Sequence, residues 1–169
     1  MSAIEECIKL NPTKKIVLFG CSRGAATTVV TLSNLSKDAL GHIKLVIVEA
    51  PFDSVESVVN ESSWFPSPTL YFIENFTKYD KNQQSPLDSV SSDKFPLDIP
   101  IAFVMSKVDT RVPIKNTQNL INVLKNKNHT KLHQLILENS HHALMHSHNK
   151  EDQNSYINFV NELYETYLR

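Results

Sequence analysis

The sequence predicts an α/β fold in which helices cover a parallel, doubly wound sheet. Two observations predict this class. Short continuous apolar runs of strand length alternate along the chain with longer segments of helical spacing. The runs show little polar alternation, which is typical of parallel strands that are covered on both faces. With 169 residues, of which 41% are hydrophobic, the chain is expected to form a single domain over residues 1–169.

The first half of the chain contains two predicted strands and two predicted helices. A helix is expected over Ser2 to Leu10, because Asn11-Pro12 would end it. The apolar run from Ile16 to Phe19 predicts the first strand. Small and apolar residues from Arg23 to Leu35 predict a helix packed closely on the sheet, and Leu45 to Val48 predict the second strand.

The second half repeats the alternation of strand and helix. Ile101 to Met105 predict the third strand, and Leu132 to Leu137 predict the fourth. Pro113 suits the first turn of a helix that continues through Leu124, and helical spacing predicts a last helix from Tyr156 to Tyr167. Strands that alternate with helices in this way imply right-handed crossovers between parallel strands.

A long insertion, about residues 52–98, separates the second and third strands. It exceeds the length of a plain loop, so we expect a partly helical, cap-like segment. Its aromatic side chains are expected either to line an apolar pocket or, as is commoner, to pack in a small satellite core. These aromatic residues are Trp64, Phe65, Tyr71, Phe72, Phe76 and Tyr79.

The turn after the first strand carries the pattern Gly20-Cys21-Ser22-Arg23-Gly24. A serine on a sharp turn between strand and helix needs small neighbours, and two of the chain's three glycines flank Ser22. The helix start that follows would direct backbone N–H groups toward a developing oxyanion, and the N–H of Arg23 is the natural first donor. A phosphate-binding loop is disfavoured, because no Lys-Ser/Thr pair follows the second glycine.

A nucleophilic serine needs a histidine, and the histidine needs a carboxylate that orients it. Asp109 directly follows the third strand, so it is expected at the same sheet edge as Ser22. Its alternative role is that of a turn or helix-capping residue before Pro113. Asp53, just past the second strand, is the reserve candidate, whereas Asp98 precedes a strand and belongs at the opposite edge.

The fourth strand leads into Ser140-His141-His142-Ala143, which again places histidine at the carboxyl edge. We choose His142 as the catalytic base, with His141 as the alternate. A metal site is a rival interpretation, because His142 and His146 are four residues apart and most histidines lie in this part of the chain. The metalloprotease pattern is absent, however, because Ala143 stands at its glutamate position, so we expect neither metal nor cofactor. The histidines concerned are His129, His133, His141, His142, His146 and His148.

Composition excludes several other classes. A net charge of −1 provides no general attraction for nucleic acid. We find neither a secretory signal nor an apolar run long enough to span a membrane, and the two cysteines, Cys7 and Cys21, do not form a disulfide framework. The sequence is therefore expected to be that of a cytoplasmic protein.

Together these motifs resemble the α/β-hydrolase superfamily, especially its prolyl-oligopeptidase-like and monoglyceride-lipase-like branches. The resemblance lies in the GCSRGA turn, in the stretch Glu49 to Ser54, and in Ile99-Pro100 followed by a strand and Asp-x-x-Val-Pro. It implies Ser22 as nucleophile, His142 as general base and acid, and Asp109 as the residue that orients the histidine. It also implies cleavage of carboxylic esters, amides or thioesters through an acyl-enzyme intermediate.

The sequence departs from the family in one respect. In the family the turn strand is roughly the fifth of eight, and earlier strands supply a second oxyanion donor, whereas here the usual N-terminal half is lacking. Without that donor the rate would fall by roughly 10²- to 10³-fold. We therefore expect either a serine hydrolase for a small acyl substrate with an apolar portion, or a catalytically impaired hydrolase-like binding module or fragment of a larger assembly. A homo-oligomer or a complementing chain would cover the remaining surface.

Overall fold

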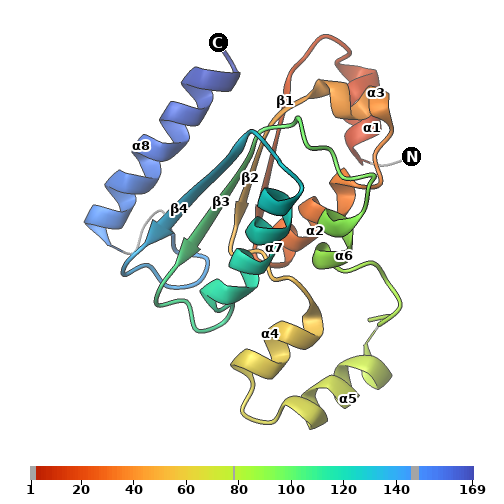
Figure 1. Ribbon diagram of the computed structural model, residues 1–169, viewed down its shortest axis with the longest axis vertical. Helices are drawn as coiled ribbons and strands as arrows, with labels where there is room; N and C mark the ends of the chain where they lie inside the picture. The colour runs from red at the N-terminus through yellow and green to blue at the C-terminus, as the bar shows by residue number, and fades with distance from the viewer. Residues whose placement is uncertain (1–2, 78, 146–148) are drawn as a thin grey trace.

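The computed structural model describes residues 3–77, 79–145 and 149–169. Within these residues, parallel strands form one sheet whose spatial order follows the order of the chain (Figure 1). This arrangement confirms the predicted fold class. The strands are β1 (Ile16–Cys21), β2 (Ile43–Glu49), β3 (Ile101–Ser106) and β4 (Leu132–Leu137).

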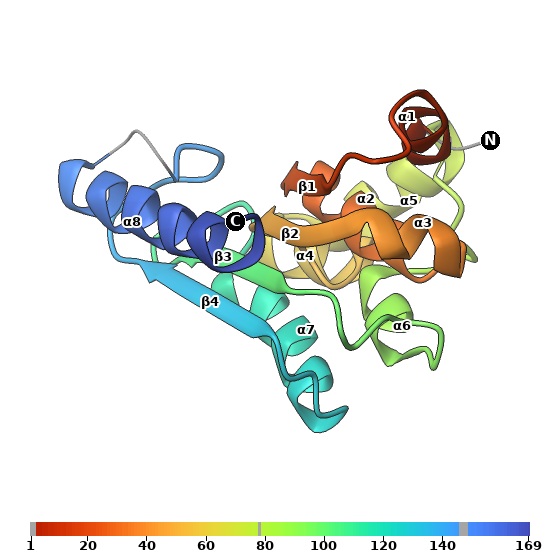
Figure 2. The same cartoon turned by 90° about the horizontal axis from the view of Figure 1, so that it is seen from above.

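Helices lie on both faces of the sheet, with α8 on one face and α2, α6 and α7 on the other (Figure 2). The helices are α1 (Ala3–Leu10), α2 (Arg23–Leu32), α3 (Lys37–His42), α4 (Val55–Ser62), α5 (Pro66–Phe76), α6 (Pro86–Ser91), α7 (Ile114–Asn126) and α8 (Lys150–Tyr167). The expected helix over 23–35 thus ends at Leu32. No helix in the described parts of the chain is long and apolar enough to cross a bilayer.

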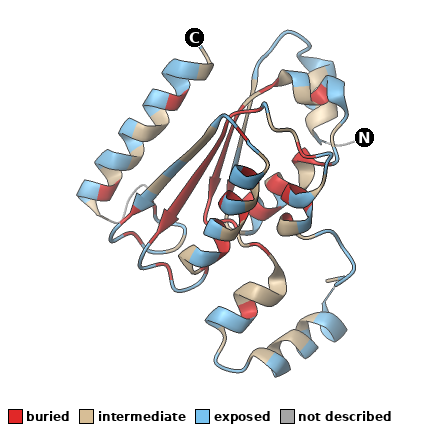
Figure 3. Cartoon of the chain, viewed as in Figure 1, coloured by how far each residue is buried: buried red, intermediate tan, exposed pale blue. Residues whose placement is uncertain are grey.

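The core has two layers because successive side chains of a strand point to opposite faces. Val46 and Val48 of β2 pack with Phe103 of β3 beneath α2, α6 and α7. Leu45 and Ile47 of β2 belong to the layer beneath α8. Figure 3 shows both central strands buried. The continuous apolar run of β2 is therefore explained by burial of the strand on both faces, as the sequence predicts.

Strand β1 is less covered than β2 and β3. It forms one edge of the sheet within the described residues, and its burial is mostly intermediate. The side chain of Phe19 remains 57% exposed. The expectation that this apolar run is covered on both faces is therefore not met at Phe19 in the described chain.

The insertion between β2 and β3 divides into a packed part and a projecting part. Val90 of α6 and Phe95 after it are buried in the core against α2 and α7, so this part belongs to the main body. Helices α4 and α5 instead extend from the carboxyl end of the sheet (Figure 1). The cap-like projection is thus shorter than the expected segment of residues 52–98.

Most aromatic side chains of the projection are exposed, and α5 contains no buried residue. Trp64 is 93% exposed, because the helix beside it packs against α4 and leaves its other sides open. For five of the six aromatic residues, neither the expected pocket lining nor the expected satellite core is formed. These five are Trp64, Phe65, Tyr71, Phe72 and Phe76.

Candidate active site

Ser22 lies between the end of β1 and the start of α2, in a backbone conformation with φ = 53° and ψ = −119°. Its backbone N–H donates to the carbonyl oxygen of Glu49 on β2 at 2.8 Å, and its own carbonyl oxygen accepts from the N–H of Ala26 at 3.0 Å. The neighbouring strand and the new helix therefore hold the serine on both sides. This is the sharp strand-to-helix turn that the glycine-flanked pattern predicts.

Gly20 is the position at which the turn requires a small residue. A Cβ atom there would lie 2.6 Å from the carbonyl oxygen of Gly24 and 2.7 Å from Oγ1 of Thr28, so helix and strand could not approach as closely. A Cβ atom at Gly24 would meet nothing within 4 Å. The second glycine of the pattern is therefore not needed for space in this chain.

The structure brings Ser22, His142 and Asp109 together in one chain of hydrogen bonds. Oγ of Ser22 lies 2.9 Å from Nε2 of His142, and Nδ1 of His142 lies 2.7 Å from Oδ2 of Asp109. The carboxylate accepts from Nδ1–H, which leaves Nε2 free to accept from the serine hydroxyl. The Asp109 side chain is 1% exposed and that of His142 is 10% exposed, so water has little access to this pair.

The loop after β3 fixes the Asp109 carboxylate. Oδ1 accepts the backbone N–H groups of Arg111 and Val112, each at 2.9 Å, while Oδ2 faces the histidine. Asp109 therefore also has the turn-forming role that the sequence offered as the alternative to orienting a histidine. Both roles fit one residue, because a carboxylate has two oxygens and several lone pairs.

The alternative candidates lie elsewhere. Asp53 is buried, and its two oxygens accept from the Ser54 N–H and the Asn119 amide. Asp98 lies near the amino ends of β2 and β3, as its place before a strand predicts. His141 is exposed, and the serine contact is made by His142 instead.

Two neighbours of Ser22 complete the turn. Arg23 is the first residue of α2, so its N–H has no acceptor within the helix and remains available to an oxyanion. Burial, and after it the Glu49 and Asp109 carboxylates, together raise the pKa of the Cys21 thiol to about 11. Cys21 is therefore a protonated thiol near neutral pH, which leaves Ser22 as the better candidate nucleophile.

The loop that carries His142 is anchored by Asp152, which the sequence did not single out. Asp152 accepts from the N–H groups of Glu138 and Asn139 at 3.2 and 2.8 Å, and from the Ser140 hydroxyl at 2.7 Å. Burial alone would raise the pKa of this carboxyl, but these hydrogen bonds outweigh it and lower the pKa. The sequence signal was modest: an acidic residue in the first turn of a helix.

A second buried carboxylate lies behind the serine turn. Glu49, at the end of β2, is 2% exposed and accepts a hydrogen bond from the Tyr156 hydroxyl on α8. Burial raises the pKa of Tyr156 above its ordinary value, and the hydrogen bond to Glu49 contributes further, so the phenol stays a donor. This contact ties α8 to the strand whose carbonyl holds Ser22.

Two of the histidines near the end of the chain have hydrogen-bond partners among the described residues. Nε2 of His133 lies 2.7 Å from the Tyr167 hydroxyl, and His129 is buried, with Nδ1 accepting from the Lys131 N–H. Burial lowers the pKa of both histidines. His146 and His148 lie outside the described residues. Among the residues that the structure describes, no cluster of three or more potential ligands could hold a metal ion.

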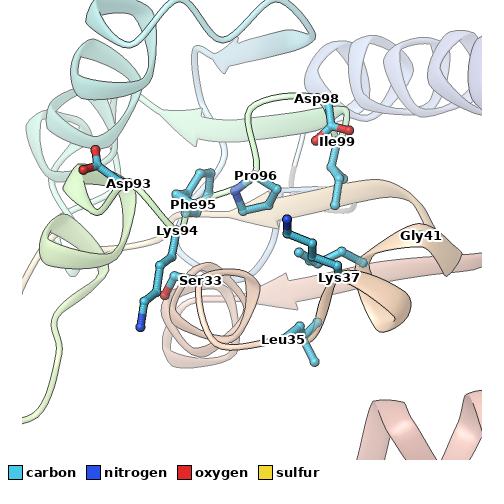
Figure 4. Close-up of a pocket in the computed structure, with 11 residues that line it drawn as sticks. Ser33, Leu35, Lys37, Gly41, Asp93, Lys94, Phe95, Pro96, Asp98 and Ile99 are labelled. Carbon is cyan, nitrogen blue, oxygen red and sulfur yellow. The ribbon is translucent and has the colours of Figure 1, made fainter.

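Two hollows of similar size lie at opposite ends of the sheet. One, of about 650 Å³, is next to the serine turn and is lined by Arg23, Phe52, Val55 and Tyr79, among others. The other, of about 670 Å³, lies at the amino ends of β2 and β3, where Phe95 and Pro96 face Lys37 (Figure 4). Of these two hollows, only the first lies beside Ser22.

The sheet and serine turn define the class as the α/β-hydrolase fold, and solved structures of that class resemble this chain. Acylaminoacyl peptidase from Pyrococcus horikoshii has a TM-score of 0.74 and 18% identity over 98% of this chain and 26% of its own. An esterase from Pyrococcus furiosus has a TM-score of 0.68 and 15% identity over 98% of this chain and 59% of its own. The esterase domain of a Rhodothermus marinus protein has a TM-score of 0.65 and 14% identity over 97% of this chain and 66% of its own.

The model of the prolyl oligopeptidase family matches residues 1–166. The chain belongs to this family, which agrees with the resemblance found in the sequence. No curated protein sequence shows detectable similarity to it. The chain spans about a quarter of the length of the acylaminoacyl peptidases that it resembles.

Proposed function

We propose that this chain is a serine hydrolase that cleaves a carboxylic ester, amide or thioester through an acyl-enzyme intermediate. The observation that carries the proposal is the continuous hydrogen-bond chain from Ser22 through His142 to Asp109. Each member follows a different strand, so the sheet itself fixes their separation. Membership in the prolyl oligopeptidase family supports the same activity class.

In the acylation step, Nε2 of His142 removes the hydroxyl proton as Oγ of Ser22 forms a bond to the carbonyl carbon. Asp109 stabilises the imidazolium that results, and the N–H of Arg23 faces the carbonyl oxygen as it becomes an oxyanion. The imidazolium then gives its proton to the departing alcohol, amine or thiol. The bond between the carbonyl carbon and this leaving group breaks, and the acyl group remains on Ser22.

Deacylation repeats the same steps with water as nucleophile. His142 removes a proton from water, the oxygen adds to the ester carbon, and the proton passes to Oγ of Ser22 as the acid is released. The apolar walls at Phe52 and Val55 would receive the apolar portion of a substrate in the hollow beside Arg23.

A fluorophosphonate probe tests the nucleophile directly. We expect covalent labelling of the wild type and none of Ser22→Ala, because the probe reacts with an activated serine. Asp109→Asn should slow labelling on the order of 10⁴-fold if the carboxylate orients the histidine as in other triads. Gel fluorescence and intact-mass measurement would quantify both effects.

Ser67→Ala is the matched control, because Ser67 is exposed on α5 and outside the triad. It should label like the wild type. If the folded wild type is not labelled at any probe concentration, the enzyme proposal fails. The alternative, a hydrolase-like binding module without catalysis, would then be the better description.

A further inference from the structure

The side chain of Arg23 lines the hollow beside the serine turn. The residue is exposed, and the hollow of about 650 Å³ extends from it over Phe52, Val55 and Tyr79. Its guanidinium has no hydrogen bond or ion pair with residues 3–77, 79–145 or 149–169. A charged group that lines the hollow and directly follows Ser22 therefore lacks a partner within the described chain.

The other charged groups around this hollow already have partners. The Tyr79 hydroxyl donates to Glu56, and Asp88 accepts from Ser85 in a capping box at the start of α6. Nζ of Lys81 lies 3.8 Å from a carboxylate oxygen of Glu74. Among these groups, Arg23 is the one that makes no hydrogen bond or ion pair with the described residues.

The position of Arg23 makes this lack of a partner more significant. It occupies the first turn of α2, where the helix dipole disfavours a cation, and that turn contains no acidic residue. A residue type that destabilises its helix and lies beside a reactive group is typical of a functional position. An anion bound from solution would relieve the unfavourable charge.

We propose that Arg23 binds a carboxylate of the substrate, so that the chain acts on esters or amides whose acyl portion ends in a carboxylate. This inference rests on the proposed function, because Ser22 must be the nucleophile that the acyl group reaches. A guanidinium matches a carboxylate with two parallel N–H bonds. Glu56 and Asp88 line the same hollow and would repel a dianion, which favours a single carboxylate over a phosphate.

Two 4-nitrophenyl esters test the proposal: the mono-ester of adipic acid, which has a free carboxylate, and the same ester with that carboxylate methylated. The wild type should prefer the free carboxylate in kcat/KM by about tenfold or more, the effect of one charge-assisted pair. Arg23→Gln should bring this ratio close to one, and Arg23→Lys should leave an intermediate ratio because it keeps the charge but loses the fork.

Arg169→Gln is the matched control, since it removes a guanidinium paired with Glu165 on the last helix, and it should keep the wild-type ratio. An equal fall of kcat/KM for both esters in Arg23→Gln would overturn the proposal, as would a wild type without preference. If the wild type neither hydrolyses the esters nor reacts with the fluorophosphonate, the proposed function fails. In that case, calorimetric titration with adipate tests the Arg23 site by itself. Binding to the wild type that is lost in Arg23→Gln supports the site. Equal binding to both proteins, or no binding to the wild type, contradicts it.

Discussion

The backbone at Ser22 has a positive φ of 53°, a region that residues with a side chain rarely adopt. Such a conformation costs on the order of 1–3 kcal/mol and persists only where its surroundings hold it. Here the carbonyl of Glu49 and the N–H of Ala26 hold it from both sides. This strained residue is the one whose hydroxyl reaches His142. Ala143, directly after that histidine, also has a positive φ, of 60°.

Replacement of Gly20 by alanine tests how closely α2 approaches β1. The new methyl group would lie 2.6 Å from the Gly24 carbonyl oxygen, so the helix must shift, at a cost of roughly 1–3 kcal/mol in the free energy of unfolding. Gly24→Ala is the matched control: it adds the same methyl group in open space and should be neutral or stabilise the helix by up to about 1 kcal/mol. Urea denaturation measures both. Equal effects of the two variants would contradict the packing described for Gly20.

At the scale of elements, α5 has apolar side chains on several sides but no buried residue. Helices of this kind are normally covered by neighbouring structure. In the described chain α5 packs against α4, and the aromatic residues around it stay exposed. The α4–α5 projection therefore contributes little to the core, and changes on its surface should have small effects on stability.

Trp64 provides a direct test of this exposure, because it is the chain's only tryptophan and is 93% exposed. We expect fluorescence emission typical of indole in water, and quenching by acrylamide close to that of free tryptophan. Unfolding in urea should shift the emission little, while circular dichroism at far-ultraviolet wavelengths reports the full transition. A large red shift on unfolding would mean that Trp64 is covered in solution.

At the scale of the whole molecule, stability is linked to pH through Asp152. Its pKa is lowered in the folded protein, so its contribution is complete above the unfolded value of about 3.9 and is lost as the pH falls through the folded pKa. Asp152→Asn removes charged acceptors for the loop at Glu138 to Ser140 and should lower the free energy of unfolding by about 1.5–3 kcal/mol at pH 7.

The difference in the free energy of unfolding between wild type and Asp152→Asn should narrow as the pH falls below about 3.9, because the carboxyl of the unfolded chain is protonated first and the native carboxylate only at a lower pH. Thermal unfolding of both proteins over a pH series measures this difference. Glu151→Gln is the control: the neighbouring carboxylate is exposed, so that variant should follow the wild type at every pH. A difference that stays constant down to pH 2, or one that grows in acid, would contradict the role given to Asp152.

The sequence predicts the sheet well because continuous apolar runs define buried parallel strands, as at Leu45 to Val48. The same logic selected Ser22, Asp109 and His142: each follows a strand, and the carboxyl ends of parallel strands meet at one edge. Their hydrogen bonds span up to 120 residues of sequence, yet strand order alone brings them together. The choice of His142 over His141 depended on local pattern, and the structure places His142 against Ser22.

Contacts between helices and loops could not be predicted in the same way. The Tyr156 contact with Glu49 joins residues that are 107 positions apart, and the hydrophobic pattern of neither α8 nor β2 indicates that the two side chains meet. The role of Asp152 depends on how α8 returns to the end of β4, and the exposure of Trp64 depends on the lack of a neighbour for α5. Such features follow from tertiary packing, on which hydrophobic periodicity carries little information.

The projection between β2 and β3 has one more consequence. A protease that cuts the exposed α5 would leave Ser22 on one fragment and Asp109 and His142 on the other. The two pieces would still share the buried pairing of β2 with β3 and the core on both faces, to which α5 contributes no residue. The site is therefore divided between two halves of the chain that need packing, but not a continuous backbone, to align a serine with its histidine.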